Sequence, residues 1–370
     1  MRAELPSRAR CVIIGGGVGG TSIAYHLAEL GWSDVLLLER SELTSGSTFH
    51  SAGLVGQLRG SVSLTRMMMD SVELYRALAG GEHDPGWIEC GGIRLACTPE
   101  RWEETRRQAG WAKTFGLPLE LISAEEARER FPLMVTDGVI GASWLPTDGY
   151  LDPSRLTYAL ADGARRGGCR ILTHTRVTGI DVRDGAVRGV RTDRGEVECE
   201  VLVDAGGMYA AEIGRMAGVR VPLVPMAHEY LVTQPFRERG GGHLPTLRDP
   251  DHLIYFREEG GGLVMGGYER RSAPWALAGG DGLDAIPPDF NGRLLEEDWD
   301  RFEEIAVNAR VRVPAMEDVR VTRLRGRSTS TSSTASLRTS TAGCSRRTGT
   351  GSRRSSRTRA CGCRRWRTCG

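Results

Sequence analysis

Residues 11–40 read CVIIGGGVGGTSIAYHLAELGWSDVLLLER, and the order of features in this stretch predicts how the first domain folds. It opens on a short apolar run rich in β-branched side chains, as a buried parallel strand requires. Residues 21–30 carry apolar side chains at helical spacing, and Gly31 follows as a natural end to the helix. Residues 35–38 form a second apolar run. The stretch therefore predicts a strand, a helix and a second strand in an α/β domain.

Three glycines, Gly15, Gly17 and Gly20, stand in GxGxxG spacing between the first predicted strand and the helix. The first allows a tight turn, the second lets the backbone approach a pyrophosphate, and the third lets the helix pack on the strand. The helix then points its N–H groups at the phosphates. Glu39 ends the second strand, where its carboxylate can accept hydrogen bonds from both ribose hydroxyls. We expect a Rossmann-type dinucleotide site; Glu39 argues against NADP but does not separate NAD from FAD.

Composition narrows the functional classes. The 370 residues, 40% of them hydrophobic, suit two domains or one large domain. The net charge is +2, but no Asp or Glu follows Asp318, so the preceding residues are net acidic and do not suggest nucleic-acid binding. No apolar run is long enough for a membrane span or a signal peptide, so we expect a cytoplasmic protein. The nine cysteines lack metal-ligand spacing and the histidines do not cluster, so no metal site is expected.

The pattern of the first domain is interrupted and later resumes. Residues 91–98 alternate like a strand and belong to a section without nucleotide-binding signals. From Tyr150, a helix capped by Asp152 and several short strands return the chain to the first domain. Later residues are rich in short strands, and 294–307 read as an acidic amphipathic helix. The sequence predicts an α/β nucleotide-binding domain interleaved with a β-rich α+β domain. The expected segments are 8–80 and 148–218 for the first domain, and 81–147 and 219–318 for the second.

Residues 319–370 differ from the rest of the chain. They are rich in arginine, serine and threonine and carry few large apolar side chains, so they cannot bury enough surface to offset their ordering entropy. A basic arm for nucleic acid or membranes is one interpretation. We favour another, because a GC-rich gene read out of frame yields this mixture of residues. We therefore expect a disordered tail in a C-terminally truncated or frameshifted sequence.

Residues 41–59 read SELTSGSTFHSAGLVGQLR. The part from Gly46 to Leu54 resembles the segment G-S/T-T-x-H-x-A-G-L of the dimethylglycine and sarcosine dehydrogenase family, flavoproteins of the D-amino acid oxidase superfamily. The resemblance covers about residues 8–320 and implies a glycine-rich FAD domain interleaved with a β-rich substrate domain. In that family the histidine of the segment is attached to the flavin 8α carbon, and His50 matches it. The resemblance thus implies FAD as cofactor, with covalent attachment through His50; an ordinary loop histidine is the alternative.

Further site residues follow from the same resemblance. With the glycine motif and Glu39 included, the candidate cofactor-binding residues are Gly15, Gly17, Gly20, Glu39, Arg40, Ser47, Thr48, His50, Leu54, Val177 and Gly206. A plain strand-to-helix turn is the alternative for Gly206. His228 resembles a family histidine near the substrate and Tyr255 resembles its partner tyrosine, so both are candidate catalytic residues that act on an amine. The alternative is that both are ordinary strand residues with satisfied hydrogen bonds.

These features predict an FAD-dependent amine dehydrogenase or oxidase of EC 1.5 type. Its expected substrate is an N-methylated glycine, sarcosine or dimethylglycine, whose N-methyl C–N bond is oxidised by hydride transfer to the flavin. The electron acceptor stays open, and neither nucleic acid nor a membrane is expected as a partner. Two alternatives remain: a non-catalytic, flavoprotein-like regulatory subunit and a noncovalent FAD amino acid oxidase. The motif at 41–59 disfavours an NAD-dependent dehydrogenase.

Overall fold

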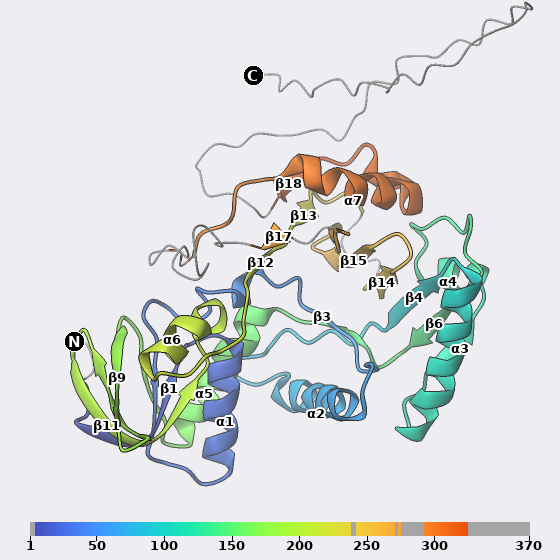
Figure 1. Ribbon diagram of the computed structural model, residues 1–370. Helices are drawn as coiled ribbons and strands as arrows, with labels where there is room; N and C mark the ends of the chain where they lie inside the picture. Colours follow the sequence, from blue (N-terminus) through green and yellow to red (C-terminus); the bar gives the residue numbers. More distant parts are fainter. Residues whose placement is uncertain (1–3, 238–241, 271–272, 275–289, 291, 325–370) are drawn as a thin grey trace, which may run out of the picture.

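Two large sheets, one of six strands and one of eight, carry the fold (Figure 1). Two short two-stranded sheets accompany them. The structure is a computed structural model, and the residues it describes are 4–237, 242–270, 273–274, 290 and 292–324. Within this part of the chain, no helix is both long enough and apolar enough to cross a membrane.

The six-stranded sheet has the order β8-β2-β1-β11-β10-β9. Its strands are β1 (Arg8–Ile14), β2 (Val35–Leu38), β8 (Arg170–Leu172), β9 (Val177–Arg183), β10 (Ala186–Thr192) and β11 (Gly195–Asp204). β1 pairs in parallel with β2 and β11, and β2 pairs in parallel with β8. β9, β10 and β11 form an antiparallel meander. The predicted strand-helix-strand start is confirmed, and the helix between its strands is α1 (Val18–Glu29).

Both faces of β1 are buried, and alternate side chains enter different cores. Cys11 and Ile13 pack on the side of α1 and α5 (Pro153–Arg166), which lie side by side in Figure 1. Val12 and Ile14 pack on the other side, in the same core as Ile213 of α6 (Ala210–Met216). This double burial explains why the strand reads as a continuous apolar run rather than an alternating one.

The eight-stranded sheet has the order β18-β13-β16-β15-β14-β4-β6-β5. Its strands are β4 (Gly92–Ala96), β5 (Glu120–Ile122), β6 (Gly141–Leu145), β13 (Tyr230–Thr233), β14 (Thr246–Asp249), β15 (Ile254–Glu259), β16 (Gly262–Gly267) and β18 (Val321–Leu324). Three of its strands precede β8 to β11 in the chain and five follow them. The predicted interleaving of two sheet-based parts is therefore confirmed.

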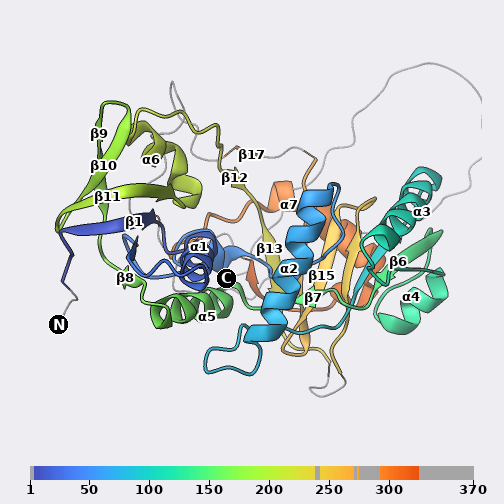
Figure 2. The same cartoon turned by 90° about the horizontal axis from the view of Figure 1, so that it is seen from below.

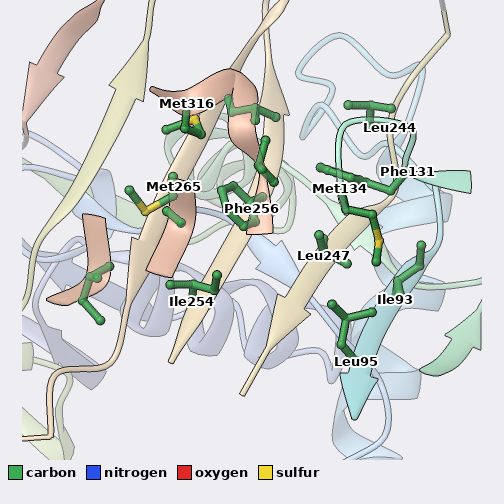
Figure 3. Close-up of a cluster of buried hydrophobic side chains, with 14 of the residues drawn as sticks. Ile93, Leu95, Phe131, Met134, Leu244, Leu247, Ile254, Phe256, Met265 and Met316 are labelled. Carbon is green, nitrogen blue, oxygen red and sulfur yellow. The ribbon is translucent and has the colours of Figure 1, made fainter. Parts of the chain in front are cut away.

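The largest core lies on one face of the eight-stranded sheet, beneath α7 (Trp299–Arg312). Figure 3 shows Phe256, Met265 and Met316 gathered at one end of this core, with Phe131 and Met134 at the other. These five side chains are at most 2% exposed. The sheet and α7 are therefore held together chiefly by burial of apolar surface.

The remaining elements surround the two sheets. They are α2 (Val62–Leu78), α3 (Pro99–Thr114), α4 (Ala124–Arg130), β3 (Leu54–Val55), β7 (Gly149–Tyr150), β12 (Met226–Ala227) and β17 (Ala273–Pro274). In Figures 1 and 2, α2 and α7 lie on opposite sides of the eight-stranded sheet. Asp152 caps α5 as predicted, because its Oδ1 accepts from the backbone N of Ser154 at 2.8 Å and of Arg155 at 3.0 Å.

Two boundaries correct the sequence-based expectation. The helix expected at 294–307 is α7, which starts later because Asp298 accepts a hydrogen bond from the backbone N of Arg301 at 3.1 Å and caps it. β18 pairs antiparallel with β13, so the segment expected to be disordered, 319–370, opens with a strand of the second sheet. The rest of that segment, 325–370, lies outside the described residues.

Candidate cofactor and substrate site

A cavity of about 460 Å³ lies where β1, β2 and β11 end. Open α/β sheets bind ligands at the carboxyl ends of their strands, so this is the expected place for a dinucleotide. The predicted cofactor-binding residues that line it are Gly15, Gly17, Glu39, Arg40, Ser47, Thr48, Val177 and Gly206. The other three, Gly20, His50 and Leu54, lie outside its lining.

The glycine turn has no room for a side chain at two of its three positions. Gly15 has a φ of +116°, and a Cβ on it would overlap the carbonyl oxygen of Ala205. A Cβ on Gly20 would overlap the carbonyl oxygen of Gly15, so Gly20 lets α1 pack closely on the turn. Gly17 has an ordinary φ of −79°, and a Cβ on it would lie 3.0 Å from Oγ1 of Thr48 in the cavity wall. Gly15 therefore allows the tight turn and Gly20 the close helix packing, while the approach of a pyrophosphate at Gly17 remains a prediction.

Glu39 is held in place by the turn that it faces. Its Oε2 accepts from the backbone N of Gly16 at 2.6 Å, and its Oε1 accepts from the backbone N of Ser41 at 2.8 Å. Each carboxylate oxygen can accept a further hydrogen bond, so a ribose can still bind. At the start of α1, the backbone N of Val18 donates to Oγ1 of Thr48 at 3.1 Å. The residue after the second strand is therefore fixed against the glycine turn before any ligand binds.

Replacing Glu39 with alanine should weaken FAD binding by roughly 1–3 kcal/mol, because charge-assisted hydrogen bonds to the ribose are lost. Titration of flavin fluorescence measures the dissociation constant, which should rise about 5- to 150-fold. Glu42→Ala is the matched control, since Glu42 is a nearby acid whose side chain is 63% exposed and pairs with His174. An unchanged affinity for Glu39→Ala would show that this carboxylate does not hold the ribose.

The sequence patterns did not predict the residues on one side of this cavity. Arg40 was predicted, but its guanidinium lies over the ring of Tyr209, 4.0 Å from the ring centre, and Tyr209 was not predicted. Other lining residues that were not singled out include Thr175, Arg176, Asp204, Met208 and Glu212. Most of them follow the ends of β8 and β11, so strand ends in the sequence were the signal that could have found them.

A second cavity, of about 350 Å³, opens against the eight-stranded sheet and contains the predicted catalytic residue Tyr255 on β15. Three arginines line it, Arg59, Arg94 and Arg248, and none of them was predicted. The guanidinium of Arg94 contacts Gln108 and Glu104. Among the described residues, the guanidinium groups of Arg59 and Arg248 have neither a hydrogen bond nor an ion pair to a protein acceptor.

The arginines that line this second cavity outnumber its acids, so their charge is only partly balanced. Burial lowers the pKa of the Arg59 guanidinium, and the positive charge of Arg248 lowers it further. Asp148 is the one carboxylate in the lining, and burial raises its pKa to about 6, although Gln57 donates to its Oδ1 from the backbone N at 2.9 Å. An anion that entered the cavity would therefore find two cations ready to receive it.

The two predicted catalytic residues lie together. Nε2 of His228 is 3.4 Å from the hydroxyl of Tyr255. Tyr255 lines the second cavity, whereas His228 does not and reaches it through the tyrosine. Burial raises the pKa of Tyr255, with smaller contributions from Tyr268 and Tyr230, so its hydroxyl stays protonated. Their catalytic roles remain predictions, but the contact between them is observed.

The sequence family described as FAD dependent oxidoreductase matches residues 10–340. The chain belongs to this family. Dimethylglycine dehydrogenase, mitochondrial, of Rattus norvegicus is 38% identical over 325 residues, which are 85% of this chain and 37% of that protein. Sarcosine dehydrogenase, mitochondrial, of Homo sapiens is 38% identical over 321 residues, which are 85% and 34% of the two chains. The resemblance stated from residues 41–59 is thereby confirmed.

This chain is also similar to a further relative and to a solved structure. The pyruvate dehydrogenase phosphatase regulatory subunit, mitochondrial, of Mus musculus is 34% identical over 86% of this chain and 36% of its own length. The crystal structure of L-proline dehydrogenase from P. horikoshii superposes with a TM-score of 0.76 at 28% identity, covering 86% of this chain and 81% of that one. The chain spans little more than a third of the length of its curated relatives.

Two observations indicate that the first cavity is suited to the FAD of this family. The turn around Gly15 is a cradle that side chains would fill, so backbone N–H groups can approach a pyrophosphate. The Glu39 carboxylate lines the same cavity and retains acceptor capacity for ribose hydroxyls. Both are features that a dinucleotide requires.

His50 lies on the segment that joins the two cavities. Residues 46–48 line the first cavity, and 55, 56, 58 and 59 line the second, so His50 and Leu54 fall between them along the chain. The imidazole lies against the ring of Phe49, with ring centres 3.9 Å apart and planes inclined by 38°. In an FAD-dependent oxidoreductase the flavin ring must extend from the nucleotide site toward the substrate, so this position suits the predicted attachment, which remains a prediction.

One cluster of potential metal ligands was not anticipated. Cys97, Asp249 and His252 bring ligand atoms within 4.8 Å of one another. Asp249 is fully buried, however, and its Oδ2 already accepts from Nε of Arg312 at 2.9 Å and lies 2.9 Å from Nδ1 of His252. The Arg312 guanidinium also lies 3.3 Å from the sulfur of Cys97. A cation thus already neutralises this carboxylate, and the cluster ties α7 to β14.

Proposed function

We propose that this FAD-dependent oxidoreductase oxidises the N-methyl C–N bond of an N-methylated glycine, sarcosine or dimethylglycine. The observation that carries the proposal is the second cavity, which Arg59 and Arg248 line together with Tyr255, and whose two guanidinium groups have no hydrogen bond or ion pair among the described residues. A carboxylate is the natural partner of such guanidiniums, and a phenol can hydrogen-bond an amine. The names of the dimethylglycine and sarcosine dehydrogenase relatives support the same substrate class.

Each group then has one task. FAD, when bound, accepts the hydride from the N-methyl carbon. Arg59 and Arg248 hold the substrate carboxylate and so fix which end of the molecule enters first. Tyr255, with His228 behind it, contacts the amine and removes its proton. Loss of hydride from the neutral amine leaves an iminium ion, to which water adds, and the adduct breaks down to the demethylated amine, formaldehyde and a proton. His50 is proposed to anchor the cofactor covalently.

Replacing Arg248 with methionine should raise the KM for sarcosine or dimethylglycine about 10- to 150-fold, because a hydrogen bond to a charged group contributes roughly 1.5–3 kcal/mol. The measurement is anaerobic bleaching of the flavin band in stopped flow, as a function of substrate concentration. Arg106→Met is the matched control, since Arg106 is 57% exposed on α3 and pairs with Glu103.

A substrate series tests the same proposal from the ligand side. N-methyl amines that lack the carboxylate should bleach the flavin of the unmutated protein poorly, and their rates should change little in Arg248→Met. If Arg248→Met slowed flavin bleaching equally for substrates with and without a carboxylate, Arg248 would have a role in the reaction other than binding the carboxylate. Bleaching by N-unsubstituted amino acids alone would support the noncovalent amino acid oxidase instead.

A second candidate function is a regulatory subunit that binds flavin without turning over an amine. The mouse relative named as a phosphatase regulatory subunit, at 34% identity, favours it. Full flavin occupancy with no bleaching by any N-methyl amine would support this candidate and reject the enzyme. The electron acceptor stays open. The cytoplasmic location remains a prediction, and these three relatives are described as mitochondrial.

A further inference from the structure

His228 lies between a phenol and a carboxylate. Its Nε2 is 3.4 Å from the hydroxyl of Tyr255, and its Nδ1 is 3.6 Å from Oε2 of Glu269. The His228 ring stacks on Tyr268, with ring centres 5.5 Å apart and planes inclined by 24°. Both tyrosines line the second cavity. The array therefore leads from the proposed substrate site, through the imidazole, to an acidic side chain.

Glu269 is a buried carboxylate with its own cationic support. Its side chain is 9% exposed, and its Oε1 faces Nε of Arg301 at 3.9 Å. Arg301 also faces Glu229 at 3.6 Å and Asp298 at 3.9 Å, so one guanidinium lies within 4 Å of three carboxylates. Burial by itself raises the pKa of Glu269, but the contact with His228, a backbone hydrogen bond and the charges of His228 and Arg301 outweigh it and lower the pKa. Glu269 is therefore ionised at neutral pH.

We propose that Glu269 is a positioning residue that keeps the proton of neutral His228 on Nδ1, so that the lone pair of Nε2 faces the hydroxyl of Tyr255. This inference rests on the proposed function, in which His228 and Tyr255 act on the substrate amine. The preference is electrostatic, because an imidazole lone pair that faced the carboxylate would be repelled, whereas an N–H in the same place is attracted. The charge of the Glu269 carboxylate produces this preference at the observed 3.6 Å, without a short hydrogen bond to the imidazole.

The arrangement gives one proton a route out of the cavity. A neutral amine is the form that gives up hydride, so an ammonium substrate must first lose a proton. The Tyr255 oxygen takes that proton while its own passes to Nε2 of His228, which leaves the tyrosine unchanged and an imidazolium beside Glu269. The His228 side chain is 37% exposed, so it can pass the proton to water. The titratable groups around this path are Tyr255, Tyr230, Tyr268 and Glu269. Arg301 lies behind the carboxylate and Arg248 near the phenol.

The test is ¹⁵N NMR of the full chain labelled at its seven histidines, since ring nitrogen shifts report which nitrogen carries the proton. His228→Asn identifies the two signals. Above neutral pH the unmutated protein should show the Nδ1–H form, and Glu269→Leu should move both signals toward the Nε2–H form. Glu269→Gln, which removes the charge and keeps the shape, should move them part of the way. Unchanged His228 signals in both variants would overturn the proposal.

A matched pair elsewhere in the chain supplies the control. Nδ1 of His243 lies 3.6 Å from Oε2 of Glu258, the same separation as in the His228 pair, and the same Nδ1 also lies 3.2 Å from the hydroxyl of Tyr150. Glu258→Leu should move the His243 signals and leave those of His228 in place. Unshifted signals from the other histidines in each variant report that the fold is retained. Movement of the His228 signals in Glu258→Leu would show that they respond to a general loosening of the protein structure. It would overturn the role assigned to Glu269.

Kinetics then separate this inference from the proposed function. With sarcosine at saturation, flavin reduction should be slowed in Glu269→Leu at pH values where the substrate is an ammonium, and the deficit should shrink as the amine deprotonates. If the unmutated protein is reduced and Glu269→Leu shows the same pH profile, the positioning role is wrong. If no N-methyl amine reduces the unmutated protein, the proposed function fails, while the NMR result still decides which nitrogen of His228 is protonated.

Discussion

Replacing Gly17 with valine should leave the chain folded and abolish retention of FAD. Gly17 has a φ of −79°, which any residue adopts, so the backbone tolerates a side chain there. A Cβ at this position lies 3.0 Å from Oγ1 of Thr48 in the wall of the first cavity, and the two valine methyl groups extend further into that space. The pyrophosphate can then no longer approach the backbone N–H groups at the start of α1.

The expected loss is large because each hydrogen bond from an N–H to a phosphate contributes roughly 1.5–3 kcal/mol. Losing two of them raises the dissociation constant of FAD by about 100-fold or more. Flavin content after gel filtration and fluorescence titration both measure it, and circular dichroism checks the fold. Gly110→Val is the control, since a Cβ on Gly110 of α3 has open space around it. Undiminished flavin content in Gly17→Val would refute the site assignment.

Local sequence patterns predicted the nucleotide-binding part of the fold well, for a physical reason. Residues 11–14 and 35–38 are buried on both faces, so their apolar runs carry the signal of parallel strands without help from distant residues. Gly20 is required by the close approach of the Gly15 carbonyl oxygen five residues earlier, and Gly15 by its positive φ in the turn. The part of the cavity formed by the glycine turn and Glu39 was accordingly predicted.

The parts that were not predicted depend on residues far apart in the chain. Arg59, Arg94 and Arg248 meet in one cavity only because β4 and β14 pair in parallel and the segment after β3 passes over them. Glu269 was not recognised because an isolated acid after a strand carries no signal of the histidine it faces. Likewise, α7 continues to Arg312 because that side chain pairs with buried Asp249, which a helical pattern of apolar residues does not reveal.

Loss of the flavin from His50→Ala under acid is the clearest result expected of this chain. Along the chain, His50 lies between residues 46–48 of the first cavity wall and 55–59 near the second, and so between the proposed cofactor and substrate sites. Its neighbours Ser51 and Gly53 are small, which allows a planar ring to come close. Attachment needs a neutral imidazole nitrogen as the nucleophile toward the 8α carbon.

The experiment compares acid precipitates of the protein purified with FAD. In the unmutated chain the yellow colour should stay in the pellet, and a tryptic peptide that contains His50 should carry the flavin mass. In His50→Ala all flavin should move to the supernatant as free FAD, with the fold retained. His83→Ala is the control, because His83 pairs with Asp162 and lines neither of these two cavities. FAD that acid extracts fully from the unmutated protein would contradict covalent attachment, and an amine-oxidising enzyme with noncovalent FAD would then be the surviving interpretation.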